Sequence, residues 1–93
     1  YKYQSLASGF VNHDAEVFIV TVEPKPEAHK IYKNTHPGQE FNLVLEGSMD
    51  LFIGDKTIRL EEGDSIYFDS GKPHGMLAVG NKAVKFLAFV VGK

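Results

Sequence analysis

The chain of 93 residues is 43% hydrophobic and 24% charged, which suits one globular domain and excludes a disordered or fibrous chain. The net charge of −2 argues against direct contact with nucleic acid, because phosphates are neutralised by clustered Lys and Arg. Cys is absent, which excludes disulfides and thiol catalysis. No apolar run approaches the roughly 18 residues of a membrane span, which excludes a membrane partner. We expect a cytoplasmic protein.

Short segments with a period of two residues follow one another along the chain. We expect a first strand through Tyr3, Leu6 and Phe10. Further strands are expected at 16–22, 41–46, 48–53, 56–60, 65–68, 75–79 and 84–91. Glycine-containing turns separate several of them, and no segment shows a sustained helical period. About eight short strands of this kind predict an all-β sandwich or barrel.

Several of these strands are apolar on both faces. Segment 84–91 is apolar throughout except for one Lys, and segment 41–46 places Phe41, Leu43 and Leu45 on one face. An antiparallel sheet with one face in water would have a polar outer face. Two explanations stay open: burial of both faces within a closed barrel, or an outer surface covered by an edge strand or a second copy of the chain. We expect a homodimer.

Two His and one Glu lie where strands are expected to begin. His36 precedes Pro37-Gly38, a pair suited to the centre of a type II turn, and Glu40 follows as the first residue of a strand. A Gly-Lys-Pro turn places His74 at the start of another strand. Such a set can form a facial triad with open coordination positions, suited to Fe, Mn, Ni, Zn or Cu. The alternative is a turn His, a surface Glu and a strand-end His that share no ligand.

Residues 36–47 and 63–74 resemble the two sequence motifs of the cupin superfamily. The matching positions are His36, Glu40 and Gly47 in the first motif and Gly63, Gly71 and His74 in the second. The resemblance covers about residues 16–91 and implies a double-stranded β-helix, or jelly-roll barrel, for residues 1–93 as one domain. It also implies that His36, Glu40 and His74 are the metal ligands.

The departures from the cupin motifs concern the metal site. Asn34 stands where the family has its first metal-binding His, and Ala78 replaces the final Asn of the second motif. Cupin enzymes commonly surround the metal with three His and one Glu, and Asn is a poor ligand for such metals. His29 is five positions out of register. The resemblance therefore implies a weakened or vestigial site for one divalent transition metal (Fe, Mn, Ni, Zn or Cu), either retained or lost.

A ligand pocket is expected with or without the metal. Glu40 and Asn42 share a strand face, and the fold would bring Asn34 close to the metal ligands. A few polar groups in an apolar barrel mouth are typical of small-molecule sites. We predict Asn34, Asn42 and Met76 as ligand-binding residues, Met76 because it shares a strand face with His74. The alternatives are a solvent-facing Asn42 and a Met76 that only fills the core.

The chain resembles in particular small cupins that form the C-terminal part of bacterial transcription regulators, behind a helix-turn-helix domain. This resemblance implies a part of a longer chain that binds a small-molecule effector and reaches DNA only through an N-terminal domain. One alternative is a metal-dependent cupin enzyme of the dioxygenase or isomerase type. The missing His and the lack of an evident acid–base residue weigh against it, and no catalytic residue is predicted. A dimerisation domain with a silent pocket is a further alternative.

Overall fold

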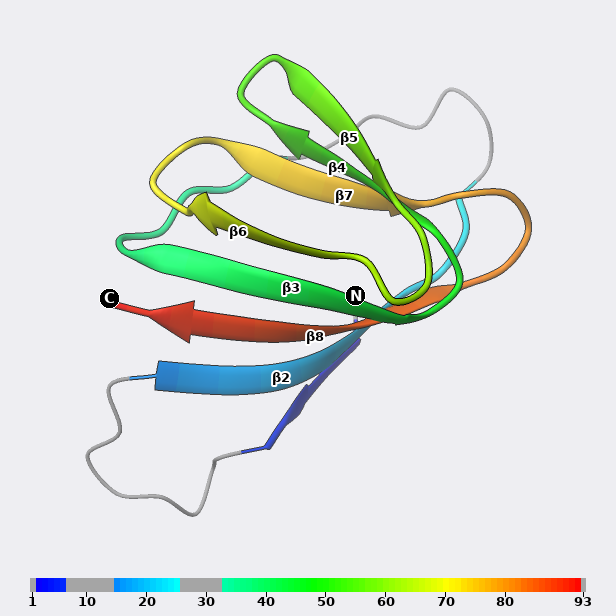
Figure 1. Ribbon diagram of the computed structural model, residues 1–93, viewed down its shortest axis with the longest axis horizontal. Helices are drawn as coiled ribbons and strands as arrows, with labels where there is room; N and C mark the ends of the chain where they lie inside the picture. The colour runs from blue at the N-terminus through cyan, green and yellow to red at the C-terminus, as the bar shows by residue number, and fades with distance from the viewer. Residues whose placement is uncertain (1, 7–14, 26–32, 93) are drawn as a thin grey trace.

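The computed structural model describes residues 2–6, 15–25 and 33–92. Every regular element in these segments is a β-strand, and the strands form two sheets (Figure 1). The strands are β1 (Lys2–Ser5), β2 (Ala15–Val22), β3 (Gln39–Glu46), β4 (Met49–Ile53), β5 (Lys56–Leu60), β6 (Ser65–Asp69), β7 (His74–Ala78) and β8 (Val84–Val91). The all-β class and the jelly-roll architecture expected from the sequence are confirmed.

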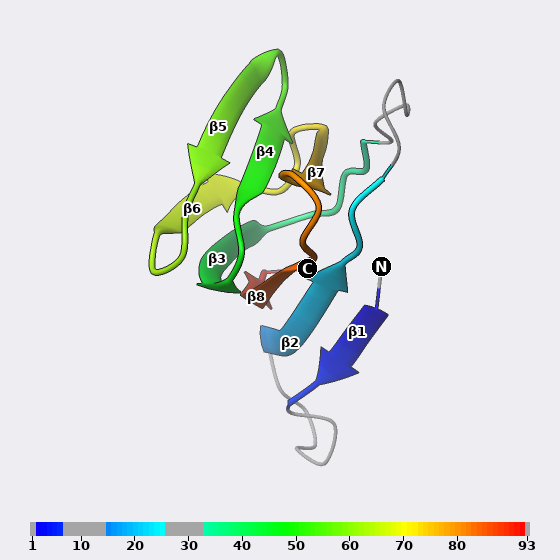
Figure 2. The same cartoon turned by 90° about the vertical axis from the view of Figure 1, so that its right-hand side faces the viewer.

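Antiparallel pairing connects distant parts of the chain. The five-stranded sheet has the order β1-β2-β8-β3-β6, and the three-stranded sheet has the order β5-β4-β7. Strand β8 pairs with β2 on one side and with β3 on the other. Figure 2 shows β4, β5 and β7 on one side of the molecule and β1, β2, β3 and β8 on the other. Residues from both halves of the sequence therefore face one interior.

The interior between the two sheets is filled by apolar side chains from both. The buried apolar residues are Val20, Val22, Val44, Met49, Leu51, Leu60, Phe68, Met76, Val84, Phe86 and Ala88. Burial of one Val, Leu or Phe side chain contributes roughly 1.5–3 kcal/mol relative to exposure. This core is therefore the main source of stability, and it holds the two sheets and their inward-facing polar side chains in place.

Strand β3 carries polar residues inward and apolar residues outward. Glu40 and Asn42 are buried at 5% and 0% exposure, whereas Leu45 is 38% exposed. Phe41 and Leu43, the other residues of the outward face, are only partly buried. Because side chains alternate along a strand, Glu40 and Asn42 point to the same face, and Phe41 and Leu43 point to the opposite face. The interior thus receives a carboxylate and an amide from this strand.

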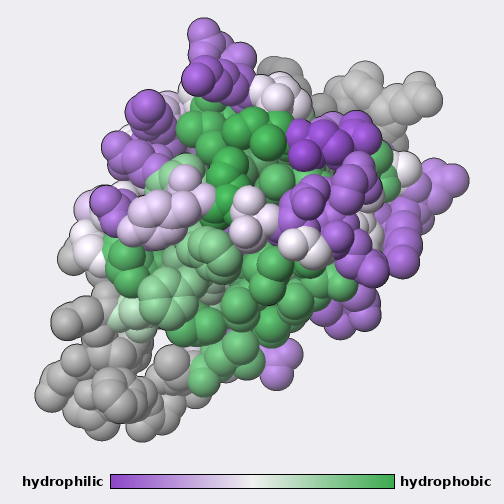
Figure 3. All heavy atoms as spheres, in the orientation of Figure 1, coloured by the Kyte–Doolittle hydropathy of each residue, from purple (hydrophilic) through white to green (hydrophobic). Residues whose placement is uncertain are grey.

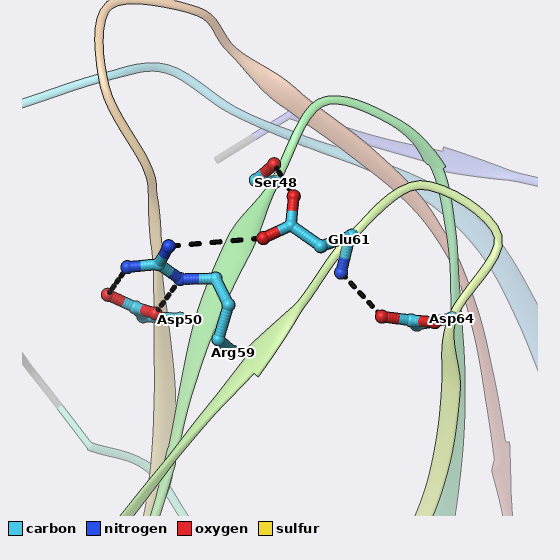
Figure 4. Close-up of polar contacts among 5 residues, drawn as sticks. All are labelled: Ser48, Asp50, Arg59, Glu61 and Asp64. Carbon is cyan, nitrogen blue, oxygen red and sulfur yellow. Dashed lines mark hydrogen bonds and ion pairs between the residues drawn. The ribbon is translucent and has the colours of Figure 1, made fainter.

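The outward face of the three-stranded sheet carries an ion pair between β4 and β5 (Figure 4), next to the apolar Phe52 and Leu77. Arg59 on β5 lies opposite Asp50 on β4, and its Nε donates to Asp50 Oδ1 at 2.6 Å. Arg59 Nη1 also lies 3.9 Å from Glu61 Oε2, and the Glu61 carboxylate accepts a hydrogen bond from the Ser48 hydroxyl. The hydrogen bond and the charge of Asp50 raise the pKa of Arg59 above its ordinary value. The part of this face around Asp50 and Arg59 is therefore suited to water.

The outward face of the five-stranded sheet is apolar. Directly opposed residues of antiparallel strands point to the same face. We call outer patch the cross-strand neighbours Val17, Ile19, Phe41, Leu43, Tyr67, Leu87 and Phe89. Tyr67 is 60% exposed and Phe89 is 37% exposed, and Figure 3 shows hydrophobic residues gathered over β3, β8 and β2. Its composition is that of an interaction surface.

Two expected strand boundaries are wrong by a few residues. Strand β3 begins at Gln39, which already pairs with β6 and β8, so Glu40 is the second residue of its strand and not the first. The first strand ends at Ser5, which leaves Leu6 beyond it, and Phe10 lies outside the described residues.

In the segments that the structure describes, no helix is long and apolar enough to cross a membrane.

Candidate metal centre and ligand cavity

A cavity of about 310 Å³ lies between β2, β3 and β8 on one side and β7 on the other. Most of its wall is apolar, with Phe18 and Phe86 among the larger contributors. Three polar residues of the wall, His36, Glu40 and His74, each offer one ligand atom, and these atoms lie within 4.8 Å of one another. The structure thus brings together the three residues that the sequence motifs singled out.

A tight turn at residues 36–38 positions the first imidazole. Gly38 has a φ of 100°, as the second central residue of a type II turn requires, and a Cβ there would lie 2.0 Å from the Val91 carbonyl oxygen. The His36 backbone N donates to the Ser70 carbonyl at 3.0 Å, and the Ser70 N donates to the Gly38 carbonyl at 3.2 Å. The docked turn leaves His36 Nε2 3.1 Å from Glu40 Oε1.

The second imidazole belongs to the first residue of β7, His74, which is 6% exposed. Its Nδ1 donates to the Lys72 carbonyl at 2.9 Å, and because a carbonyl only accepts, Nδ1 carries the proton. Its Nε2 lies 3.6 Å from Glu40 Oε1. Backbone bonds to Asn34 in both directions, at 2.8 and 2.9 Å, hold the strand end in place. The ring is therefore fixed in tautomer and position.

The Glu40 carboxylate is held by one oxygen and presents the other. In the amide orientation that satisfies its hydrogen bonds, the Asn42 nitrogen donates to Glu40 Oε2 at 2.8 Å and to the Phe41 carbonyl at 3.1 Å. The other oxygen, Oε1, faces both His36 and His74. Ligand carboxylates and imidazoles of metal sites are commonly oriented by such partners.

This donor set fits one divalent transition metal. Two imidazole nitrogens and one carboxylate oxygen suit Fe, Mn, Ni, Zn or Cu better than Ca or Mg. The distances of 3.1 and 3.6 Å from Glu40 Oε1 to the two His Nε2 atoms are compatible with bonds of about 2.0–2.2 Å to one shared ion. Glu40 and His74 are each oriented by a further protein group, so little rearrangement is needed to bind the ion.

The other predicted site residues take different positions. Asn34 and Met76 both line the cavity. Asn42 is fully buried and is not among the described residues of the cavity wall, and its amide contacts Glu40 instead. It is therefore not solvent-facing. Contact of these residues with a ligand stays a prediction, and His29 lies outside the described residues.

Two cavity residues were missed by the sequence analysis. Glu16 lines the cavity from β2 and Tyr3 from β1. Glu16 stands on the same face of its strand as Phe18 and Val20, both of which line the cavity too. A carboxylate in line with an apolar, inward-facing stripe was a signal available in the sequence. Tyr3 had no comparable signal, since its position depends on the pairing of β1 with β2.

The sequence model of the family described as "Cupin domain" matches residues 13–90. The chain belongs to the cupin family. Its two-sheet barrel and its His and Glu residues between the sheets agree with the motif resemblance seen in the sequence. No curated protein matches this cupin sequence.

Solved structures similar to this cupin domain include regulators and a metalloprotein. A transcriptional regulator of the HTH_3 family from Vibrio cholerae is 26% identical with a TM-score of 0.80, over 99% of this chain and 51% of the regulator. HppE, solved with Fe(II) and substrate, is 26% identical with a TM-score of 0.80, over 97% of this chain and 53% of HppE. The cupin domain thus spans about half the length of each.

A further similar structure is itself an isolated domain. It is the Cupin_2 domain of an XRE family transcriptional regulator from Enterobacter cloacae, with 17% identity and a TM-score of 0.83. The match covers 99% of this chain and 96% of that domain. At this identity the likeness shows the fold alone.

Proposed function

We propose that this cupin domain is the ligand-sensing part of a bacterial helix-turn-helix transcription regulator. The proposal rests on one observation: the side chains of His36, Glu40 and His74 lie together at a cavity large enough for a small molecule. The likeness to the Vibrio regulator, half of whose length the domain spans, supports this role. The domain acts in the cytoplasm, and its net charge of −2 suits a part that reaches DNA only through an attached domain.

In this proposal, His36, Glu40 and His74 hold one divalent transition metal. When bound, the metal supplies a Lewis acid with open positions for donor atoms of the effector. Asn34 and Met76 contact the effector from the cavity wall, and Asn42 keeps the Glu40 carboxylate oriented. The effector acts on the attached domain only through its different affinity for two arrangements of the regulator.

Elemental analysis of protein purified without chelator tests the metal site. We expect a stoichiometric transition metal in the wild type and its loss in His36→Ala, with little change in the thermal stability of the metal-free protein. His13→Ala, outside both motifs, is the matched control and should keep the metal. A metal-free wild type that also fails to take up added Fe(II), Ni²⁺ or Zn²⁺ would remove the metal from the proposal. Unfolding of His36→Ala would make His36 a structural residue.

The gene upstream of the codon for Tyr1 tests the regulator assignment. We expect a helix-turn-helix domain in the same reading frame. A start codon adjacent to Tyr1 would contradict the assignment. This observation is independent of the metal content, so the two parts of the proposal can fail separately.

A metal-dependent enzyme is the second candidate, favoured by the likeness to HppE with Fe(II) and substrate. The two candidates differ in what happens to the bound molecule. We would incubate the metal-loaded domain with the small-molecule fraction of a bacterial extract, with His74→Ala as the control. A compound retained unchanged by the wild type alone supports the sensor. A compound consumed by the wild type alone supports the enzyme.

We also propose that the domain forms a homodimer through the outer patch. The patch is apolar across β2, β3 and β8, and it is continuous because its members are cross-strand neighbours. A second copy presents the same apolar surface, so a symmetric pairing matches like with like. The mass of the protein in solution measures this directly.

A further inference from the structure

We infer that the cavity selects a ligand with two unlike ends, an oxygen donor for the metal and an ammonium group that Glu16 recognises. The inference rests on the proposed ligand binding at this cavity and adds the chemical class of the ligand. Glu16 is the specificity-determining residue.

Two carboxylates face the cavity at the same level. Glu16 on β2 and Glu40 on β3 are both paired with Val90, on opposite sides of β8. Opposed residues point to one face of the sheet, and all three line the cavity. Because neighbouring strands lie about 4.8 Å apart, the two Glu Cα atoms are about 10 Å apart.

The surroundings of the two carboxylates differ. Glu40 faces His36 at 3.1 Å and His74 at 3.6 Å, which makes its surroundings suited to a metal and its anionic ligands. Glu16 instead shares its strand face with Phe18, the next residue of the cavity wall. The carboxylate at one position faces two imidazoles, whereas the carboxylate at the other shares its strand face with an aromatic residue of the cavity wall.

Aromatic rings in the same cavity wall as Glu16 strengthen the preference for a cation. Tyr3 and Phe18 both line the cavity, and their rings meet edge to face with centroids 5.9 Å apart. Ring faces attract ammonium groups, and a carboxylate in a partly apolar wall attracts them more strongly than in water. A carboxylate also has lone pairs for several donors, so Glu16 accepts from a ligand in addition to its contacts within the protein.

The separation of the two ends limits the length of the ligand. Both Glu side chains point into the cavity from one sheet face, so the roughly 10 Å between their Cα atoms must hold the metal's bonds to Glu40 and to the ligand, each about 2.1 Å, and a hydrogen bond of about 2.9 Å. A chain of a few carbon atoms between carboxylate and ammonium fits this span.

The test compares two probes of equal length by NMR titration of the Zn²⁺-loaded domain. The probes are 4-aminobutanoate and pentanoate, in which a methyl group replaces the ammonium. We expect the wild type to bind 4-aminobutanoate at least about tenfold more tightly, the worth of one hydrogen bond between charged groups. Glu16→Gln should abolish this preference. Glu46→Gln, on the exposed end of β3, should keep it.

A charge reversal separates recognition from a structural role. Glu16→Lys should prefer glutarate, which carries a second carboxylate, over 4-aminobutanoate, and a residue that only supports the fold would not invert the preference. Equal binding of both probes to the wild type, or a preference that survives Glu16→Gln, overturns the inference. Normal uptake of Zn²⁺ without binding of either probe overturns it too but leaves the metal site standing. Failure to take up any metal instead refutes the metal site itself.

Discussion

Strand β3 and the β4–β5 pair of the other sheet distribute polar and apolar residues in opposite ways. In the three-stranded sheet, Leu51 faces the core and Asp50 and Arg59 face outward. In the five-stranded sheet, β3 turns Glu40 inward and Phe41 outward. A buried polar group is costly unless it has partners, and an exposed apolar face is costly unless it is covered. Strand β3 therefore combines a candidate site inside the barrel with an apolar surface outside it.

The largest effect is expected from a charge in the outer patch. Phe89→Asp should convert the homodimer into a monomer, because an unpaired charge buried in an apolar interface costs about 3–5 kcal/mol. Thr57→Asp, on the outward face of the three-stranded sheet, is the control and should leave the dimer intact. Light scattering after size exclusion measures both masses. A monomeric wild type would show that the outer patch has another role.

Truncation of a leucine to alanine should lower the free energy of unfolding more in the core than in the outer patch. Leu51→Ala removes a fully buried side chain and should lower the free energy of unfolding by about 2–5 kcal/mol. Leu87→Ala, in the outer patch, should cost much less in the monomer and act mainly on dimer affinity. Urea unfolding over a range of protein concentrations separates the two effects. Equal costs at low concentration would mean that the outer patch is part of the monomer core.

The inward polar residues of β3 should matter for the metal more than for the fold. Asn42→Leu keeps the branching and the number of side-chain heavy atoms but removes the donor to Glu40 Oε2, which should cost about 1–3 kcal/mol in stability. Metal affinity should fall about 10–100-fold, as when other orienting partners are lost. Asn81→Leu, in an exposed turn, is the control. Unchanged metal affinity in a folded Asn42→Leu protein would separate Asn42 from the site.

The smallest effect is expected on the outward face of the three-stranded sheet. Arg59→Ala should leave the thermal unfolding temperature unchanged within error, because exposed ion pairs contribute little. Since folding raises the pKa of Arg59, its contribution is complete below the ordinary pKa and is lost only as the pH rises above it. Unfolding scans at about pH 5, 7 and 9 should therefore show the same small difference between variant and wild type. A large, pH-dependent loss would contradict this.

Strands and motif residues were predictable from the sequence, but their orientation was not. Period-two alternation located the strands, and the motif spacing selected His36, Glu40 and His74. Alternation defines two faces of β3 without saying which one meets the core, and its more apolar face turned outward. The contact of Asn42 with Glu40 depends on the amide orientation within the folded site. The strand face of Glu16 could be read from its apolar neighbours, but its place opposite Val90 and level with Glu40 depends on pairing with β8.

A β-sheet is a single layer of backbone, and this has a consequence for β3. Glu40 inside and Phe41 outside are consecutive residues, so one peptide unit separates the chamber from the surface proposed to pair two copies. Ligand binding in the cavity and the proposed pairing of two copies therefore both involve β3, and a small rotation of this strand changes both together. Substitutions on β3 that change which effector binds would therefore be limited to those that also preserve the proposed dimer.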